Sequence, residues 1–297
     1  MNIITILEKP GLWQLYTLSA FFLLGSITMY GPLTDPCLLV TGKSVCKEGA
    51  EIFVSRSIAI GLLYVGTFYF TLTHINKDDA PKLKRLANMG TMCVTALLAS
   101  IIFIGPSNQG GLENSMLHFI DLISGFILLA IMISAIGDGS NMAAPSSPLK
   151  GHGINPKTFL FFLTVVVFLK LVFMSELTDP SLFLVNRGSV TAFSRELWKF
   201  MIAIMLMILF PIIFALGYGN YKDQEAIAGV TVIMMIASLI SYFPIRDQLV
   251  KGIMTMAPIS GGVIFLFAIT TIFFGRSSRP DENETIINEK TEPEETV

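Results

Sequence analysis

The sequence predicts an all-α integral membrane protein, with eight transmembrane helices arranged as two tandem four-helix repeats. Three observations lead to this fold class: few charged residues, long apolar runs and an internal repeat. Charged residues make up 14% of the 297 residues and apolar residues 53%, whereas a soluble domain carries about 25% charged residues. So few charges cannot cover a water-facing surface, which places the chain in the membrane class.

Long apolar runs give the positions of the expected spans, because a helix needs about 20 mostly apolar residues to cross the hydrocarbon core. Six runs lie cleanly between charged residues, at about 12–32, 57–76, 86–106, 197–219, 226–244 and 252–275. Two more, at about 115–137 and 157–178, contain ionisable residues. The first run is long enough to remain as a span, so we do not expect a cleaved signal peptide.

The tetrapeptide LTDP occurs twice, at 33–36 and at 177–180, each time at the end of a long apolar run. The matches that follow keep the same order in both halves: FVSR 53–56 with FSR 193–195, ALLASIIFIGP 96–106 with MIASLISYFP 235–244, and ISG 123–125 with ISG 259–261. Collinear matches favour an internal duplication. Both halves should then contain the same number of spans, and eight spans give four to each half.

The duplication defines the expected domain organisation. Repeat 1 covers 1–137 and repeat 2 covers 157–275, and a linker rich in Gly, Ser, Pro and Asn joins them at 138–156. Residues 276–297 form an acidic, polar tail that we expect to be disordered. A unit of four spans returns the chain to its starting side, so the repeats should be related by a pseudo-twofold axis along the membrane normal, the geometry of parallel repeats.

The distribution of Lys and Arg predicts the orientation in the membrane, since cytoplasmic loops carry an excess of both. The side that holds the termini and the linker has eleven of them, including the cluster KLKR at 82–85, and the other side has eight. Both termini are therefore predicted to be cytoplasmic. The two LTDP loops then lie on the opposite side of the membrane.

The duplicated loops contain the elements of a helix start. Asp35-Pro36 and Asp179-Pro180 each combine a good N-cap with a proline suited to the first helical position. Each loop is expected to form a short helix at the membrane interface, either as an architectural connection or as a lid over a cavity. The matched Arg56 and Arg195 are expected either to pair with these Asp residues or to anchor at lipid headgroup phosphates.

Ionisable residues inside two spans break the repeat symmetry. Asp121 and Lys170 lie about two turns from the outer membrane face, where a charge costs at least about 2.5 kcal/mol on insertion scales. We predict that they pair, with His118 one turn from Asp121 and Glu176 further out. The group is either a polar ligand pocket or an ion pair that docks the two repeats, and the sequence leaves both alternatives open.

The sequence contains no HExxH, CxxC, glycine-rich phosphate loop or nucleophile elbow, so no metal, no cofactor and no catalytic residue is predicted. Cys37 and Cys46 share the first outer loop and would form a disulfide if that loop is lumenal or extracellular. The basic residues form no stripe, which argues against nucleic acid as a partner. Membrane lipid is the expected partner. Other membrane subunits would be partners as well if the protein is an accessory subunit of a larger complex.

Three functions remain compatible with these features. The first is binding or transport of a small apolar or amphiphilic molecule in a cavity between the two repeats. The second is a non-catalytic accessory or assembly subunit of a larger membrane complex. The third, a lipid-modifying membrane enzyme, is the least favoured because no catalytic motif occurs. A polar cavity between the repeats would favour transport, and a closed, well-packed interface would favour the accessory role.

Overall fold

The structure is a computed structural model that describes residues 11–30, 49–104, 112–137, 140–145, 156–172, 184, 192–243, 247, 262 and 264–271. Side chains in these ranges are described except at 49–51, 103–104, 112–121, 170–172 and 192–197. The described part of the chain is all-helical, with α2 (Leu12–Tyr30), α4 (Gly49–Ile75), α5 (Ala80–Ile104), α6 (Leu112–Ile136), α7 (Pro156–Val172), α8 (Ala192–Gly217) and α9 (Tyr221–Tyr242). A further helical segment covers 264–271.

Five of these helices are long and apolar enough to cross a bilayer, and the spanning stretches are Leu12–Tyr30, Ile52–Ile75, Ala80–Ile102, Trp198–Gly217 and Tyr221–Tyr242. Two other apolar stretches, Leu122–Ile136 and Pro156–Leu169, are shorter in the described residues. This length and composition indicate an integral membrane protein, because backbone polar groups in lipid must be satisfied within the helix. The count of eight spans goes beyond these five helices and stays a prediction.

Several helices begin earlier than the apolar runs alone predict. Helix α5 begins at Ala80, so the basic cluster at 82–85 lies in its first turns and not in a loop. Helix α9 begins at Tyr221, so the expected loop at 220–225 is mostly the first turn of that helix. The expected spans ended at charged residues, but a helix continues into the headgroup region, where its charged side chains are solvated.

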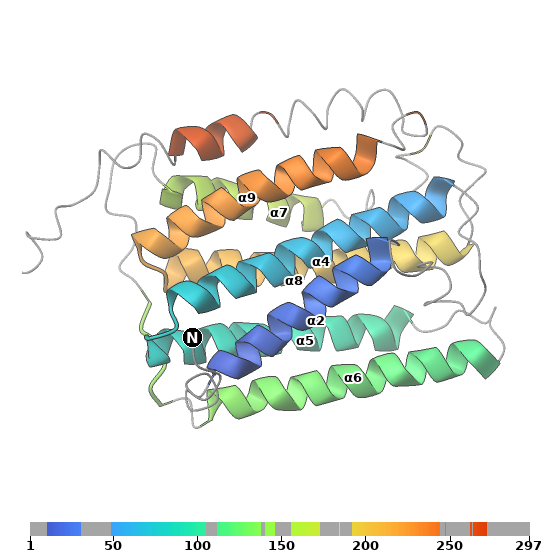
Figure 1. The fold of residues 1–297 in the computed structure, drawn as a ribbon, viewed down its shortest axis with the longest axis horizontal. Helices are drawn as coiled ribbons and strands as arrows, with labels where there is room; N and C mark the ends of the chain where they lie inside the picture. Colours follow the sequence, from blue (N-terminus) through green and yellow to red (C-terminus); the bar gives the residue numbers. More distant parts are fainter. Residues whose placement is uncertain are drawn as a thin grey trace, which may run out of the picture.

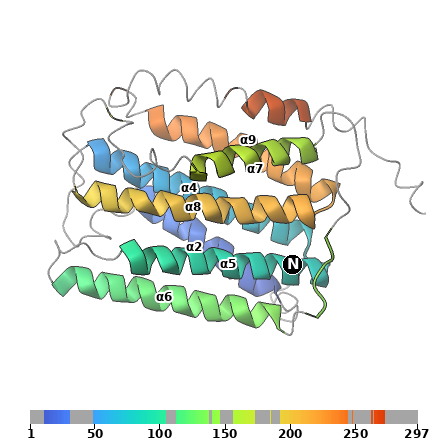
Figure 2. The ribbon, with the colours of Figure 1, turned by 180° about the vertical axis from the view of Figure 1, so that it is seen from behind.

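Helices α4 and α8 lie at the centre of the bundle (Figure 1). Helix α4 packs against α2, α8 and α9, while α8 packs against α4, α5 and α7. The view from behind shows α8 in front of α4, with α5 and α7 on its two sides (Figure 2). Helix α6 lies at one edge, beside α5, and the segment 264–271 lies at the opposite edge. Residues 140–145 run without helical structure between the two halves of the chain.

The seam between α4 and α8 is close and apolar at its middle. A Cβ added at Gly61 of α4 would overlap Cγ2 of Ile204 on α8, so only glycine allows the two helices to approach this closely. Towards their C-terminal ends the two helices contribute fully buried side chains to one apolar core, among them Val65, Leu72, Met207 and Ile212. At one end of the seam the Phe53 ring stacks on Trp198, with 5.4 Å between the ring centroids.

Candidate functional site

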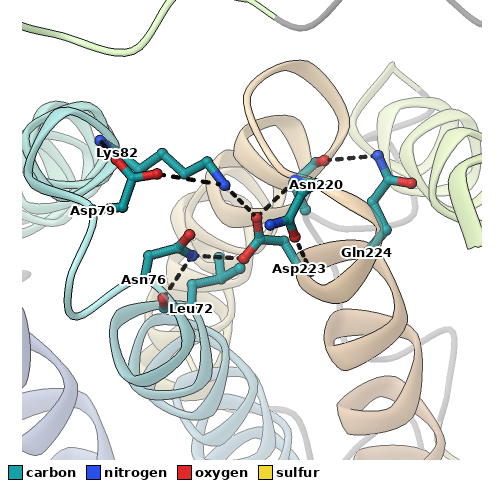
Figure 3. A network of polar contacts seen from close by, with 8 residues as sticks. Leu72, Asn76, Asp79, Lys82, Asn220, Asp223 and Gln224 are labelled. Atoms are coloured by element: carbon teal, nitrogen blue, oxygen red, sulfur yellow. Dashed lines mark hydrogen bonds and ion pairs between the residues drawn. The ribbon is translucent and has the colours of Figure 1, made fainter. Parts of the chain in front are cut away.

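The opposite end of the seam holds a buried polar network centred on the carboxylate of Asp223 (Figure 3). Asp223 is fully buried and accepts three hydrogen bonds. Asn76 Nδ2 donates to Oδ1 at 2.6 Å, while Lys82 Nζ at 3.3 Å and the Asn220 backbone N–H at 2.8 Å donate to Oδ2. The donors come from the end of α4, the start of α5 and the start of α9. The network therefore joins three helix ends around one charge.

The second half of the chain builds its part of this network as a capping box. Asn220 is the N-cap of α9, and its side chain accepts from the Asp223 backbone N–H at 3.0 Å. The Asp223 carboxylate accepts in turn from the Asn220 backbone N–H, so two open N–H groups are satisfied reciprocally. Gly219 precedes the cap because a Cβ there would lie 2.6 Å from the Ala215 carbonyl oxygen. Gln224 Nε2 donates to the same carbonyl at 3.2 Å.

The first half builds a matching helix start. Asp79 precedes α5, and its carboxylate accepts from the Lys82 backbone N–H at 3.0 Å, as an N-cap does. The Lys82 ammonium lies 3.8 Å from Asp79 and 3.3 Å from Asp223, and only the second of these carboxylates is buried. Asn76 ends α4, and its Nδ2 also donates to the Leu72 carbonyl at 2.9 Å. Lys82 and Asn76 thus connect the first half of the chain to the capping box of the second.

The contacts of this network indicate a structural role. Both oxygens of Asp223 are occupied by donors, and its charge is compensated by Lys82, whose side chain is 15% exposed. A buried carboxylate without such partners would carry a large desolvation cost. No group of three or more His, Cys, Asp or Glu side chains that could hold a metal ion occurs in the described ranges. The network is suited to holding helix ends together, because donors from the protein itself already bind both carboxylate oxygens.

Arg85 extends the same end of the bundle to residues 140–145. Its Nε and Nη2 donate to the Ala143 carbonyl at 3.4 and 3.2 Å, and its guanidinium lies 4.6 Å from the centroid of the Tyr218 ring. The Ala143 N–H donates in turn to the Pro81 carbonyl at 3.1 Å. The non-helical segment is therefore held against the start of α5 and the end of α8.

Arg56 is the one duplicated loop element whose side chain the structure describes. Its Nη1 donates to the Ser241 carbonyl at 3.0 Å, and its guanidinium lies 5.7 Å from the centroid of the Tyr30 ring. The neighbouring Ser57 hydroxyl lies 2.8 Å from the Tyr242 hydroxyl. These contacts join α4 to α2 and α9 at the end of the bundle opposite the Asp223 network.

The remaining predicted site residues lie in helices whose side chains are not described at those positions, or outside the described residues. His118 and Asp121 belong to α6, Lys170 to α7 and Arg195 to α8. Helix α6 packs against α5 and α2, whereas α7 packs against α8 and α9 on the other side of the seam. The helix arrangement gives no support to a pair between Asp121 and Lys170, which stays a prediction. The predicted residues that lie outside the described ranges are Glu176, Asp35, Pro36, Asp179, Pro180, Cys37 and Cys46.

Sequence reasoning did not single out Asn76, Lys82, Asn220 or Asp223. The signal that points to them is local: DDAP at 78–81 and GNYKD at 219–223 are both helix starts with an Asp or Asn N-cap. The N-caps Asp79 and Asn220 are 141 residues apart, close to the spacing of the other matches between the halves. A comparison of the two loops would have placed Lys82 opposite Asp223 in the repeat alignment.

Comparison with known proteins found no family model, no curated protein and no solved structure that matches this chain.

Proposed function

We propose that this protein is a non-catalytic membrane subunit, a helical scaffold whose two halves form one rigid core. The observation that carries the proposal is the closed seam between α4 and α8. Gly61 and Ile204 are in contact at its middle, the Phe53–Trp198 stack closes one end, and the Asp223 network ties the other end of α4 to α5 and α9. A closed, well-packed interface supports a scaffold, because its charged groups are used to join helices and not to receive a substrate.

The tandem repeat is part of the same proposal, with eight spans and a pseudo-twofold axis along the membrane normal. Exchanging α2 with α7, α4 with α8, and α5 with α9 maps most of the packed helix pairs onto one another; the exception is α8 with α9, whose counterpart would be α4 with α5. In particular, the packing of α5 on α8 corresponds to that of α9 on α4. The same exchange takes α6 to the segment 264–271, which lies at the opposite edge of the bundle (Figures 1 and 2). This agreement between helix packing and repeat order supports the duplication.

Binding or transport of a small apolar or amphiphilic molecule is the competing function. It needs a cavity between the halves, or a seam that opens. In the described residues the middle of the seam is filled by apolar side chains, and Asp223 has all its donors from the protein itself. A lipid-modifying enzyme would need a nucleophile beside a base, and the seam residues described above include no such pair. The scaffold therefore accounts for more of the structure than either alternative.

A double-cysteine variant tests whether the seam is closed in the membrane. A Cβ at Gly61 would lie 3.5 Å from Ile204 Cβ, at the short end of the roughly 3.5–4.5 Å range of disulfides. Gly61→Cys with Ile204→Cys, in a background without the three native cysteines, should cross-link in high yield when native membranes are oxidised. The matched control joins Gly61→Cys to Ile233→Cys, because Ile233 on α9 is 60% exposed and faces away from the seam.

Native mass spectrometry of the gently extracted protein then separates the two functions. A scaffold should retain stoichiometric protein partners, and the cross-linked form should retain the same partners as the reduced form. A retained small molecule that the cross-linked form no longer exchanges would instead establish a moving seam and transport. Failure of the seam cysteines to cross-link above the control would refute the closed interface itself.

A further inference from the structure

Arg56 lies on the outward side of α4, between the ends of two neighbouring helices. Figure 1 shows α2 and α9 on the two sides of α4. The guanidinium donates one hydrogen bond to the Ser241 carbonyl, in the last turn of α9, and lies over the ring of Tyr30, the last residue of α2. Ser241 is buried, while Tyr30 is 40% exposed. The cation is therefore held in place by the protein on two sides and borders the lipid-facing surface.

The depth of Arg56 in the membrane follows from its distance to His74. The two residues are 18 positions apart on α4, which is five helical turns, so they share one face. At about 1.5 Å per residue they are about 27 Å apart along the axis, close to the roughly 30 Å thickness of the hydrocarbon core. The same face between them carries Ile60, Leu63 and Phe70. Arg56 thus lies at the headgroup level of one leaflet and His74 at that of the other.

Aromatic residues mark the same level. Tyr30, Trp198 and Tyr242 lie around the Arg56 end of α4, and Phe53 contacts both Trp198 and Tyr242, with ring centroids 5.4 and 5.8 Å apart. Tyr and Trp concentrate at membrane–water interfaces, where their rings bridge the apolar core and the headgroups. Phe53 and Trp198 are buried in the core, so Tyr30 is the one exposed ring of this group, and the helix-length argument carries the placement of Arg56 at the headgroup level.

The guanidinium has more donors than the described residues use. An Arg side chain is always charged and carries five N–H donors, and one of them meets the Ser241 carbonyl. No carboxylate lies within ion-pair distance of Arg56 in the described part of the chain. A half-buried cation at the membrane surface is stable only with an anion or water at its remaining donors. Arginine is well matched to phosphate, which it binds with two parallel N–H donors.

We propose that Arg56 is the headgroup site of a bound phospholipid, whose phosphate accepts from the free guanidinium N–H groups. One acyl chain then lies along the outward side of α4, between α2 and α9. Two exposed apolar side chains of α2, Leu24 and Ile27, lie about two turns and one turn from Tyr30 and would contact this chain. The ligand class is a diacyl phospholipid, recognised by its phosphate and held by its chain.

The first test compares two ligands that differ only in the phosphate headgroup. The purified full-length protein in detergent is titrated with dioleoyl phosphatidylglycerol and, separately, with dioleoylglycerol, and bound lipid is counted by native mass spectrometry. The phosphate should strengthen binding at one site by about tenfold to a hundredfold, the equivalent of one charge-assisted hydrogen bond. Equal binding of the two lipids to the wild-type protein would overturn the proposal without any variant.

Variants then locate the site. Arg56→Gln keeps a donor for the Ser241 carbonyl but removes the charge, so phosphatidylglycerol should bind no better than dioleoylglycerol. Arg56→Lys keeps a point charge and should bind with intermediate affinity. Arg85→Gln is the matched control, because Arg85 makes the same kind of carbonyl and ring contacts at the other end of the bundle. Loss of the phosphate effect in Arg85→Gln, or its persistence in Arg56→Gln, would contradict the assignment. If Arg56→Gln does not fold, the affinity of Arg56→Lys and the comparison of the two lipids on the wild-type protein still test the proposal.

Discussion

Lys82 Nζ lies 3.3 Å from Asp223 Oδ2, and each residue is the third of its helix, one in α5 and the other in α9. Both helices begin with a capping residue, Asp79 or Asn220, that accepts a hydrogen bond from the backbone N–H of this third residue. Two equivalent positions therefore meet at the end of the seam with opposite charges. A pair of identical residues at these positions would repel if charged, so the two halves are complementary only because they differ.

Removing the carboxylate should destabilise the fold strongly. Asp223→Ala leaves the Asn76 amide, the Asn220 N–H and the Lys82 ammonium without their common acceptor, at an expected cost of about 3–5 kcal/mol. Lys82→Met should cost a similar amount, because it leaves the fully buried Asp223 carboxylate without its cation. Equilibrium unfolding in mixed micelles measures both. Asp79→Asn is the control, since its side chain is 41% exposed and an Asn still caps α5, so its effect should stay below about 1 kcal/mol. A mild Asp223→Ala variant would show that the network does not hold the helix ends.

Filling the close approach between α4 and α8 should also destabilise the protein. Gly61→Ala places a methyl group against Ile204, and overpacking of this kind costs about 1–3 kcal/mol. Adding Ile204→Val to Gly61→Ala should recover part of the loss, because the second change removes a methyl group from the same contact. Gly229→Ala on α9 is the matched control: nothing lies within 4 Å of its Cβ, so it should be neutral or stabilise by up to about 1 kcal/mol. If Gly61→Ala behaves like Gly229→Ala, the seam is looser than the structure has it.

Removing one buried hydroxyl should stabilise the protein, in contrast to the two changes above. Thr73 Oγ1 is buried without a hydrogen-bond partner in the described residues, whereas Thr231 Oγ1 donates to the Ile227 carbonyl at 2.8 Å. Thr73→Val should therefore stabilise the protein by about 1 kcal/mol, because an unsatisfied buried hydroxyl is lost at nearly constant volume. Thr231→Val, which removes a formed bond, should be neutral or destabilising by the same measurement. A clear loss of stability in Thr73→Val would reveal a bound water or ligand at this hydroxyl.

Arg85 should control the order of residues 140–145 without affecting the core. Arg85→Lys loses the paired donors to the Ala143 carbonyl and the planar contact with Tyr218. Hydrogen exchange measured by mass spectrometry should then rise in 140–145 and stay unchanged in α4 and α8. Lys84→Arg, at the position before Arg85, controls for a general effect of altered basic residues at the start of α5. Increased exchange throughout the bundle would mean that Arg85 supports the whole fold.

Parts of this architecture were open to prediction because they depend on short stretches of sequence. The low charge content and the apolar runs indicated a helical membrane protein, and the structure contains five helices of spanning length and apolar composition. The caps at Asp79 and Asn220 are also local signals, since capping depends on residues three positions apart, although the apolar runs alone placed both helix starts too late. Helix ends were less predictable: the run that was expected to start at residue 86 belongs to a helix that begins at Ala80, because charged side chains can continue a helix into the headgroup region.

The candidate site was less accessible to the same reasoning. The sequence favours Asp121 and Lys170 as site residues, because charges inside apolar runs are costly and therefore stand out. Asp223 and Lys82 lie at the ends of such runs, where charges are ordinary, and nothing local distinguishes a solvated residue from one that is fully buried. Their importance comes from a contact between positions 141 residues apart.

The sequence by itself determined the class of protein, because composition and apolar runs do not depend on how the chain packs, and it predicts the repeat that we propose. Only the tertiary structure decided which charges are buried, that Gly61 contacts Ile204, and that Arg56 lies between α2 and α9. Burial of a charge depends on which helix ends meet in space, and in a bundle of similar apolar helices many pairings satisfy the same hydrophobic pattern. The side chains at the contacts select one of them, and those contacts exist only once the helices have packed.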